Sequence, residues 1–400
     1  MSREQALTRL AQADWLDAAR PVFDCLDGAM GRTRAVGGIV RDTLLGRPRG
    51  STDIDMATEL TPDEVLARGK AAGLGAHPTG VEHGTVTLVH DGRAVEVTTL
   101  RRDVETFGRH ARVAFGTDWT EDARRRDFTM NALYCGVDGV LFDPLGGLED
   151  CLERRVRFIG DPDARIAEDR LRVYRYFRFA ASHGEQRLEE QALAACMRAA
   201  GELGALSAER VGSEMMRLLA QPKCAATLAA MVRVGVLAAA LFSPQALKAL
   251  ERLEALPLPI TADMRLAAME LTGAQVAALR VEWRLSNATM ASLGQLTAAL
   301  ELARAANWAE LAYRHPERRT QAIALATALD QHAIAWMNEA ISTVEGMGSR
   351  NFPISGADLL AHGMKPGPEV GAELKRLERL WIESRFELDR DGLLEQVRQP

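Results

Sequence analysis

The sequence predicts an α+β protein in which an α/β N-terminal part is followed by an all-helical remainder. From about Thr33 to Pro144 the chain carries short β-rich runs, a Gly-Gly pair and an Asp-Gly turn. After Asp150 it changes to long stretches of alanine, leucine, arginine and glutamate with helical spacing. At the usual domain size, a chain of 400 residues has room for about two to four domains.

The composition is that of an ordinary globular protein, with 47% hydrophobic and 26% charged residues. This balance excludes collagen-like, disulfide-scaffold and wholly disordered chains. The sequence has no apolar run of the roughly 20 residues that a membrane span needs. Its five cysteines are scattered and contain no CxxC pair, which favours reduced thiols over disulfides or a zinc site. We therefore expect a soluble cytoplasmic protein with no membrane partner.

The first strands and helices follow from local signals. Thr61-Pro62-Asp63-Glu64 predicts a helix start, because a capping hydroxyl precedes a proline and two acids. The runs Thr85–His90 and Ala94–Leu100 alternate around Asp91-Gly92, which predicts a hairpin. The polar stretch Val104–Trp119 has neither period and is predicted to be a mobile loop. Three further elements are expected: a strand at Arg34–Val36, a helix at Val40–Leu45 and a strand at Ser51–Ala57.

The second part is expected to be helical throughout. We predict helices over Ile166–Ser182 and Glu209–Leu219, and several more in the tract from Ala225 to about Ala340. Asn351–Gly371, rich in proline and glycine, predicts a connector with a short helix. Glu373–Phe386 then predicts a last amphipathic helix.

Residues 37–58, GGIVRDTLLGRPRGSTDIDMAT, hold the sharpest group of chemically useful residues. Asp53 and Asp55 are two apart on a predicted strand, so both carboxylates point to one face. A nearby Gly37-Gly38 turn leads into a helix N-terminus with Arg41. Together these features suit a divalent metal and a triphosphate, since amides and the helix dipole favour the anion. An isolated DxD is more often a solvated strand face.

Two later stretches add candidate residues. Glu96 lies between two core-type valines in VEVTTLRRD, so it is either an exposed strand position or a third carboxylate for the metal. In RRDFTMNAL, Arg126 can hold phosphate or ribose and Asp127 can accept from a ribose hydroxyl. Asn131 can bond to phosphate or sugar. By spacing alone this stretch is a helix start with a capping acid.

The motifs GGIVRD, DID, RRDFTMNA, DPLGGLED and EDRLRVYRYFRFAA occur in this order over roughly Arg34–Ala181. Together they resemble the bacterial class II tRNA nucleotidyltransferases, the CCA-adding enzymes, of the DNA polymerase β-like superfamily. A weaker likeness continues at Ala208–Leu219 and returns at Pro353–Gly371. The resemblance implies a nucleotidyltransferase head with a small mixed sheet (1–148), then an all-helical neck (149–222), body (223–345) and tail (346–400).

The EDRLR segment also suggests base recognition on chemical grounds. Asp169 and Arg172 are three apart and are expected side by side on one helix face. Cytosine and adenine both present an amino donor beside a ring-nitrogen acceptor, which an Asp–Arg pair matches. The alternative is a surface ion pair. Arg175 and Arg178 continue a basic stripe, and the aromatic side chains of Tyr174, Tyr176 and Phe177 could stack on bases or pack in the core.

The resemblance implies addition of CCA to the 3′ end of tRNA from CTP and ATP, with release of pyrophosphate. Asp53 and Asp55 would hold two Mg²⁺ ions, the glycines and Arg41 would cradle the triphosphate, and Asp127 would bind the ribose. The neck helices would select the nucleotide, and the body and tail would read tRNA shape. Alternatives are a bacterial poly(A) polymerase, a CC-adding-only enzyme and a non-catalytic tRNA-binding protein. The expected loop at Val104–Trp119 and the tail-like Pro353–Gly371 favour CCA addition.

Overall fold

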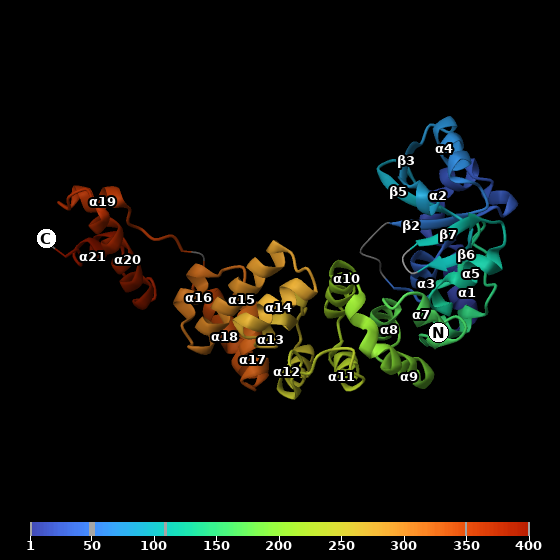
Figure 1. The fold of residues 1–400 in the computed structure, drawn as a ribbon. Helices are drawn as coiled ribbons and strands as arrows, with labels where there is room; N and C mark the ends of the chain where they lie inside the picture. The colour runs from blue at the N-terminus through green and yellow to red at the C-terminus, as the bar shows by residue number, and fades with distance from the viewer. Residues whose placement is uncertain (1, 48–52, 108–109, 349, 399–400) are drawn as a thin grey trace. The chain divides into compact units, whose positions relative to one another are not determined.

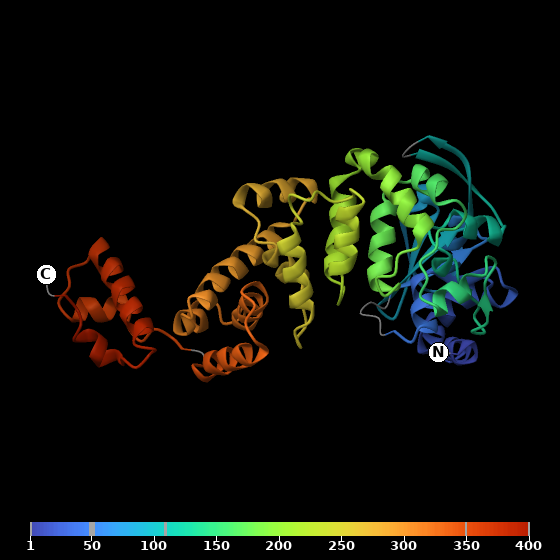
Figure 2. The same ribbon diagram turned by 90° about the horizontal axis from the view of Figure 1, so that it is seen from below.

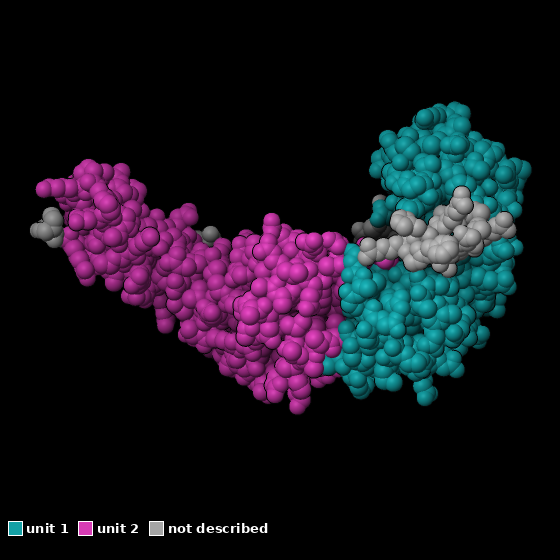
Figure 3. Space-filling view, viewed as in Figure 1, with its two compact units in different colours: residues 1–207, 230–236 teal, residues 208–229, 237–400 magenta. Residues whose placement is uncertain are grey.

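The computed structural model describes residues 2–47, 53–107, 110–348 and 350–398. Two compact units divide the chain: residues 1–207 with 230–236, and residues 208–229 with 237–400 (Figure 3). Unit 1 contains the strands, and the described part of unit 2 is built from helices (Figures 1 and 2). The expected α+β class is confirmed. The four-part division into head, neck, body and tail is finer and stays a prediction.

Unit 1 is organised around a seven-stranded mixed sheet with the order β3-β4-β5-β2-β1-β8-β9. The β2–β5 pair is parallel and the other described pairs of this sheet are antiparallel. Its strands are β1 (Thr33–Val36), β2 (Ile54–Thr58), β3 (Gly75–Gly80), β4 (Thr85–His90), β5 (Arg93–Thr99), β8 (Tyr134–Cys135) and β9 (Leu141–Phe142).

Local signals account for two of these elements. Asp91 and Gly92 both have positive φ, 47° and 74°, as the turn of a two-residue hairpin requires. The predicted β4–β5 hairpin is therefore confirmed. Helix α4 (Pro62–Ala71) begins after Thr61, whose hydroxyl accepts from the Glu64 amide while Glu64 accepts from the Thr61 amide at 2.8 Å. This capping box satisfies backbone donors that a helix start leaves unpaired.

The prediction of a loop at Val104–Trp119 is wrong. Strands β6 (Arg101–Phe107) and β7 (His110–Phe115) form a separate two-stranded antiparallel sheet, and Trp119 begins helix α5 (Trp119–Arg125). The strand pairing has a register shift between Asp103 and Glu105, which interrupts the two-residue alternation that a strand prediction needs. Residues 108–109 lie outside the described part.

The predicted helix over Ile166–Ser182 is two helices, because Asp169 has extended backbone angles (φ −147°, ψ 103°). The structure ends α7 at Glu168 and begins α8 at Arg172. The helices of unit 1 besides α4 and α5 are α1 (Arg3–Ala11), α2 (Asp14–Cys25), α3 (Gly38–Leu44), α6 (Gly147–Leu152), α7 (Pro162–Glu168), α8 (Arg172–Ser182) and α9 (Glu190–Ala199), with short 3-10 helices η1 (Gly28–Met30), η2 (Val81–His83), η3 (Thr129–Asn131) and η4 (Ala200–Ala205).

Unit 2 packs helices against one another at close range. Gly212 of α10 lies so near Trp283 that a Cβ there would fall 1.8 Å from the Trp283 carbonyl oxygen, so only glycine fits. Helix α11 (Ala225–Arg233) is divided between the two units. The other helices of unit 2 are α10 (Ala208–Leu219), α12 (Pro244–Glu254), α13 (Ala262–Ala268), α14 (Gly273–Glu282), α15 (Asn287–Arg304), α16 (Trp308–Arg314), α17 (Arg319–Leu329) and α18 (Ile334–Gly346), and then α19 (Gly356–Ala361), α20 (Pro368–Glu383) and α21 (Arg390–Leu394).

The C-terminal segment shares a small core with α16. Trp381 of α20 is buried and contacts the aromatic rings of Tyr313, Phe352 and Phe386. The predicted helix Glu373–Phe386 is confirmed as α20, which starts earlier because Pro368 occupies its first turn. It is not the last helix, since α21 follows it.

Two expectations from composition can be compared with the described residues. All five cysteines lie among them and are free thiols. Burial raises the pKa of the Cys25 thiol to about 11 and that of Cys135 to about 12, so both resist ionisation and oxidation. Across the described ranges, no helix combines the length and the apolar character that a membrane crossing requires.

Candidate active site

Two carboxylates share one exposed face of the sheet in unit 1, and a third lies just before the same strand. Asp55 of β2 and Glu96 of β5 are register partners in the parallel pair, so their side chains point the same way. Asp53 comes two residues before Asp55. All three are exposed, whereas Val95 and Val97 beside Glu96 are buried in the core. The register agrees with Glu96 lying beside Asp55, whereas the expected same-face placement of Asp53 stays a prediction.

The donor chemistry at this face fits a magnesium ion that is completed by substrate. Among the described residues, no three His, Cys, Asp or Glu side chains gather tightly enough to hold a metal by themselves. Mg²⁺ is usually held by one or two carboxylates together with substrate phosphates and water, and it does not need an all-protein cage. Asp53 and Asp55 offer hard oxygen donors in that number. Their exposure also leaves room for a substrate.

The Gly37-Gly38 turn adjoins the same end of β2. Ala35 of β1 is the register partner of Met56, and continuing this antiparallel register places Gly37 next to the start of β2. Gly37 has φ 74° and ψ −126°, a conformation that favours glycine, and α3 begins immediately after it. An ideal Cβ at Gly37 would lie 3.9 Å from Nη1 of Arg126. The register therefore places the turn beside the start of β2, and Arg126 lies next to Gly37.

Arg126 is held in place by two neighbours. Its Nε donates to the Tyr134 hydroxyl at 3.2 Å, and its Nη2 donates to Asp122 Oδ2 at 3.2 Å. Tyr134 also donates to Asp122, at 3.1 Å. Because Asp122 and Tyr134 are buried, these bonds fix the orientation of the guanidinium.

Arg41, Asn131 and Asp127 are buried and bonded to one another. Arg41 Nη1 donates to Asn131 Oδ1 at 2.6 Å, and Asn131 Nδ2 donates to Asp127 Oδ1 at 2.9 Å. Asp127 also accepts from the Phe128 amide at 2.8 Å and from Arg175 Nε at 2.8 Å. Both oxygens of this carboxylate are thus engaged. A ribose hydroxyl that bound to Asp127, as the sequence predicts, would have to replace one of these donors.

The charge state of Asp127 follows from this environment. Burial alone would raise the pKa of the carboxyl group, but the charge of Arg175 and the bonds from Asn131 and Arg175 outweigh it. The pKa of Asp127 therefore lies below its usual value. The carboxylate stays ionised and holds Arg175 of α8 against the segment that precedes η3.

Asp169 and Arg172 are not neighbours on one helix face, because α7 ends before Asp169 and α8 begins at Arg172. Asp169 Oδ1 instead accepts from the Leu171 amide at 3.1 Å. This is a local side-chain contact that competes with helix formation. Asp169 and Arg172 lie at the junction between two helices. The expectation that they sit three residues apart on one helix is wrong. Both residues are half-buried, and their role in base selection stays a prediction.

Sequence reasoning missed Glu168, which holds Arg172. Arg172 Nη1 donates to Glu168 Oε2 at 2.6 Å and to the Arg165 carbonyl at 2.8 Å, and Nη2 donates to the Arg125 carbonyl at 3.1 Å. A guanidinium has five N–H donors, so these three bonds do not exhaust it. The signal was present in the motif, since Glu168 directly precedes Asp169. The four-residue spacing of Glu168 and Arg172 was a second signal, because a Glu–Arg pair at that spacing can form an ion pair.

The aromatic side chains of α8 pack in the core. Tyr176 and Phe177 are fully buried and Tyr174 is 8% exposed, so base stacking by Tyr176 and Phe177 is excluded. Tyr176 stacks on Phe158 with centroids 5.6 Å apart. Arg178 lies over the ring of Phe179 at 4.2 Å.

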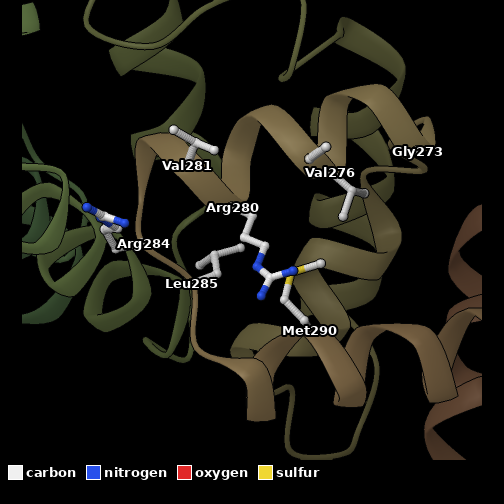
Figure 4. Close-up of a pocket in the computed structure, with 8 residues that line it drawn as sticks. Gly273, Val276, Arg280, Val281, Arg284, Leu285 and Met290 are labelled. Atoms are coloured by element: carbon white, nitrogen blue, oxygen red, sulfur yellow. The ribbon is translucent and has the colours of Figure 1, made fainter.

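A separate cationic pocket lies in unit 2, where α14 meets α15. Its volume is about 620 Å³, and its lining combines Arg280 and Arg284 with apolar side chains such as Val276 and Met290. Figure 4 shows Arg280 extending from α14 toward Met290. Arg280 donates to Asn287 at 2.8 Å, and Arg284 pairs with Glu209 at 3.1 Å. The pocket presents two guanidinium groups at an exposed surface.

Comparison with known proteins agrees with this arrangement in both units. The family model described as "Poly A polymerase head domain" matches residues 33–157, and the one described as "Probable RNA and SrmB- binding site of polymerase A" matches residues 187–253. The crystal structure of the Bacillus stearothermophilus CCA-adding enzyme in complex with CTP superposes with a TM-score of 0.76 at 27% identity. That match covers 94% of this chain and 97% of the other.

Two curated relatives match nearly end to end. The mitochondrial CCA tRNA nucleotidyltransferase 1 of Danio rerio is 33% identical over 92% of this chain and 87% of the relative. The CCA-adding enzyme of Limosilactobacillus fermentum is 30% identical over 94% of this chain and 95% of the relative. The chain therefore belongs to the family of CCA-adding enzymes, the CCA tRNA nucleotidyltransferases.

Proposed function

We propose that this enzyme adds C, C and A to the 3′ end of tRNA, using CTP and ATP and releasing pyrophosphate. The observation that carries this proposal is the pairing of the exposed Asp55 and Glu96 on one sheet face, with the exposed Asp53 just before the same strand and the Gly37 turn beside its start. In each step the terminal hydroxyl of the tRNA attacks the α-phosphate of a nucleoside triphosphate. Carboxylates, backbone amides and a guanidinium at one place supply the groups that such a phosphoryl transfer needs.

Asp53 and Asp55 would hold Mg²⁺, with Glu96 next to them on the attacking side. Bound there, Mg²⁺ would make the attacking hydroxyl easier to deprotonate and would neutralise the departing pyrophosphate. The protein itself would hold the two carboxylates at the start of β2, whose alternate residues are buried in the core. A rigid strand fixes their separation better than a loop would.

The Gly37-Gly38 turn and Arg126 would bind the triphosphate. Glycine lets the backbone approach the phosphates closely, and the start of α3 directs amide N–H groups toward them. Arg126 lies next to Gly37 and is already oriented by Tyr134 and Asp122. Arg41 is only 7% exposed. It would form part of the pocket wall and contact a phosphate group only at the bottom of the pocket.

Asp169 and Arg172 would select the base. An acceptor and a donor held close together match the amino group and ring nitrogen of cytosine and adenine, but meet uracil and guanine with like groups. Glu168 and the Arg125 carbonyl hold the Arg172 guanidinium in one orientation. Arg175 and Arg178 lie farther along α8 and would support the nucleotide pocket from that helix.

The tRNA would be read by its shape and by its phosphates. Structured RNA is recognised mostly through its backbone, and forked guanidinium groups suit phosphates. Arg280 and Arg284 in the pocket of Figure 4 are our candidates for such contacts. The five free thiols favour a reducing compartment, and we propose the cytoplasm.

The decisive experiment supplies the full-length enzyme with tRNA truncated at its 3′ end, and with CTP alone, ATP alone or both. We expect two C residues from CTP alone and one further A when ATP is also present. Runs of A from ATP alone would identify a poly(A) polymerase, and arrest after two C residues with both nucleotides would identify a CC-adding enzyme. Binding of tRNA without any incorporation would leave a non-catalytic tRNA-binding protein.

A further inference from the structure

His183 occupies a position that none of the nucleotide-binding motifs explains. It caps the C-terminal end of α8, is 8% exposed and lies in unit 1. Its Nε2 is 3.0 Å from Asp42 Oδ1 of α3, and its Nδ1 is 2.6 Å from the Ser182 hydroxyl. Asp42 directly follows Arg41. A histidine 141 residues away in the sequence therefore contacts the helix that begins at the Gly37-Gly38 turn.

The environment of His183 defines its protonation. Burial lowers the pKa of the imidazole to about 4, although Asp42 acts in the opposite direction, and Arg41 and Arg47 lower it further. Burial alone would raise the pKa of Asp42, but bonds from His183 and Arg41 hold it well below its usual range. At neutral pH a neutral imidazole thus donates from Nε2 to a charged carboxylate. The Ser182 hydroxyl is then the donor to Nδ1.

Asp42 transmits this contact to Arg41. Arg41 Nε donates to Asp42 Oδ1 at 2.9 Å, and its Nη1 donates to Asn131 at 2.6 Å. Two bonds in different directions, together with the ring of Phe179 at 5.1 Å, leave the guanidinium one orientation. Without the His183 donor, the half-buried Asp42 carboxylate would have one partner fewer and could turn with Arg41 toward solvent.

The same network reaches α8 a second time. Asn131 is bonded to Asp127, and Asp127 is bonded to Arg175 of α8. Helix α8 is therefore tied to the sheet domain near its beginning by Arg175 and at its end by His183. Arg47, which donates to the Ser182 carbonyl, adds to the second attachment. Arg41 lies in the middle of this closed path of hydrogen bonds.

We propose that His183 is a positioning residue that sets Arg41 and the C-terminal end of α8 for triphosphate binding through Asp42. The inference rests on the proposed function, because it assumes that a nucleoside triphosphate binds beside Arg41. It predicts a role in nucleotide affinity and none in base choice. The N-terminal end of α8, where Arg172 lies, keeps its own attachments to the Arg125 carbonyl and through Arg175.

The test compares His183→Leu with His183→Gln in the full-length enzyme. The glutamine amide can donate from nearly the position of Nε2, whereas leucine has similar volume and no donor. Since hydrogen bonds to charged groups are among the stronger ones, we expect His183→Leu to raise KM for both CTP and ATP about tenfold. The kcat and the preference for CTP over UTP should stay near wild type. His183→Gln should restore most of the affinity.

His315→Leu, at a half-buried histidine in unit 2, is the matched control and should leave KM unchanged. A wild-type KM in a folded His183→Leu enzyme would overturn the inference. So would an equal effect of leucine and glutamine, which would indicate packing alone. A wild-type enzyme that adds neither C nor A would instead refute the proposed function, whatever the variants do.

If His183→Leu does not fold, the wild-type protein still provides a test. Long-range ¹H–¹⁵N spectra of the histidine side chains should show one ring in the neutral Nε2–H form down to about pH 5, and His183→Gln should remove that signal. A neutral Nδ1–H tautomer of His183 would overturn the assigned hydrogen bond, because its Nε2 would be an acceptor facing the Asp42 carboxylate.

Discussion

Asp55 and Glu96 are direct neighbours across the parallel strand pair β2–β5, and both side chains leave the sheet on its exposed face. Two like charges in register destabilise a sheet slightly. Asp53, two residues before Asp55, adds a third exposed carboxylate just before this strand. A divalent cation bound among these carboxylates would reduce their mutual repulsion. Metal binding would therefore stabilise this part of the sheet.

We expect Asp53→Asn and Asp55→Asn each to lower incorporation of both CTP and ATP by on the order of 10³-fold, because each removes a metal-binding charge. Glu96→Gln should have a smaller effect. Affinity for tRNA should not change in a filter-binding assay. Glu82→Gln, at an exposed carboxylate in η2, is the control. Near-normal turnover by either aspartate variant would contradict the proposed metal site.

The cationic pocket of unit 2 gives a prediction about tRNA. Arg280→Ala and Arg284→Ala should each weaken tRNA binding. Each should also make the dependence of log K on log salt less steep, by about 0.7–0.9 in slope for each phosphate that the variant no longer binds. KM for CTP should stay constant. Arg20→Ala, which removes an exposed arginine of α2, controls for net charge. An unchanged salt slope in both pocket variants would exclude this surface from tRNA binding.

The sequence was informative where the signal is local or where a motif is intact. The Asp91-Gly92 turn, the Thr61 cap and the same-face pair Asp53 and Asp55 depend on neighbouring residues, and the structure has the first two as expected. The β6–β7 hairpin was missed because a register shift removes its alternation. The helix break at Asp169 was missed because each flanking segment has good helical spacing.

The remaining misses concern contacts between distant segments. The contact of His183 with Asp42 joins α8 to α3, and that of Arg175 with Asp127 joins α8 to the segment before η3. A single sequence contains nothing that pairs a histidine with a carboxylate 141 positions away. The motif indicated which residues could bind nucleotide. Only the folded structure shows which of them form hydrogen bonds with one another, as Asn131 does with Arg41 and Asp127.

A buried ion pair in unit 2 predicts a large effect on stability. Arg265 is fully buried and donates to the carbonyls of Leu219, Pro222 and Ile260, at 2.7, 2.8 and 3.1 Å. Its Nε also donates to Glu254 at 3.2 Å, and Glu254 accepts from the Cys224 amide at 2.7 Å. The pair thereby satisfies backbone groups at the end of α10 and the start of α11.

We expect Arg265→Met to destabilise the protein by about 3–5 kcal/mol, since it leaves a buried carboxylate and three carbonyls without their donor. Scanning calorimetry should show a transition lowered by roughly 6–20 °C for a unit of this size. Arg20→Met at the exposed Arg20–Asp17 pair should shift it by less than about 2 °C. Equal small shifts in both variants would contradict the assigned network.

The last prediction concerns base choice at the junction of α7 and α8. Asp169→Ala removes the proposed acceptor and should reduce discrimination of CTP against UTP by roughly ten- to 150-fold, as expected for a hydrogen bond to a charged group. Arg172→Ala should do the same, and the double variant should add little because the two residues would act as a unit. Glu168→Gln keeps an acceptor for Arg172 and should have a weaker effect.

The measurement is a competition among four nucleoside triphosphates for one truncated tRNA. The competing interpretation is that Asp169 merely ends α7 by bonding to the Leu171 amide. In that case Asp169→Asn, which keeps a side-chain oxygen for this amide, should behave as wild type. Base reading would use the second carboxylate oxygen as an acceptor, and asparagine replaces that oxygen with an NH₂ donor, so Asp169→Asn should then lose discrimination like alanine. Wild-type preference for CTP over UTP in Asp169→Ala would place base selection elsewhere in the protein.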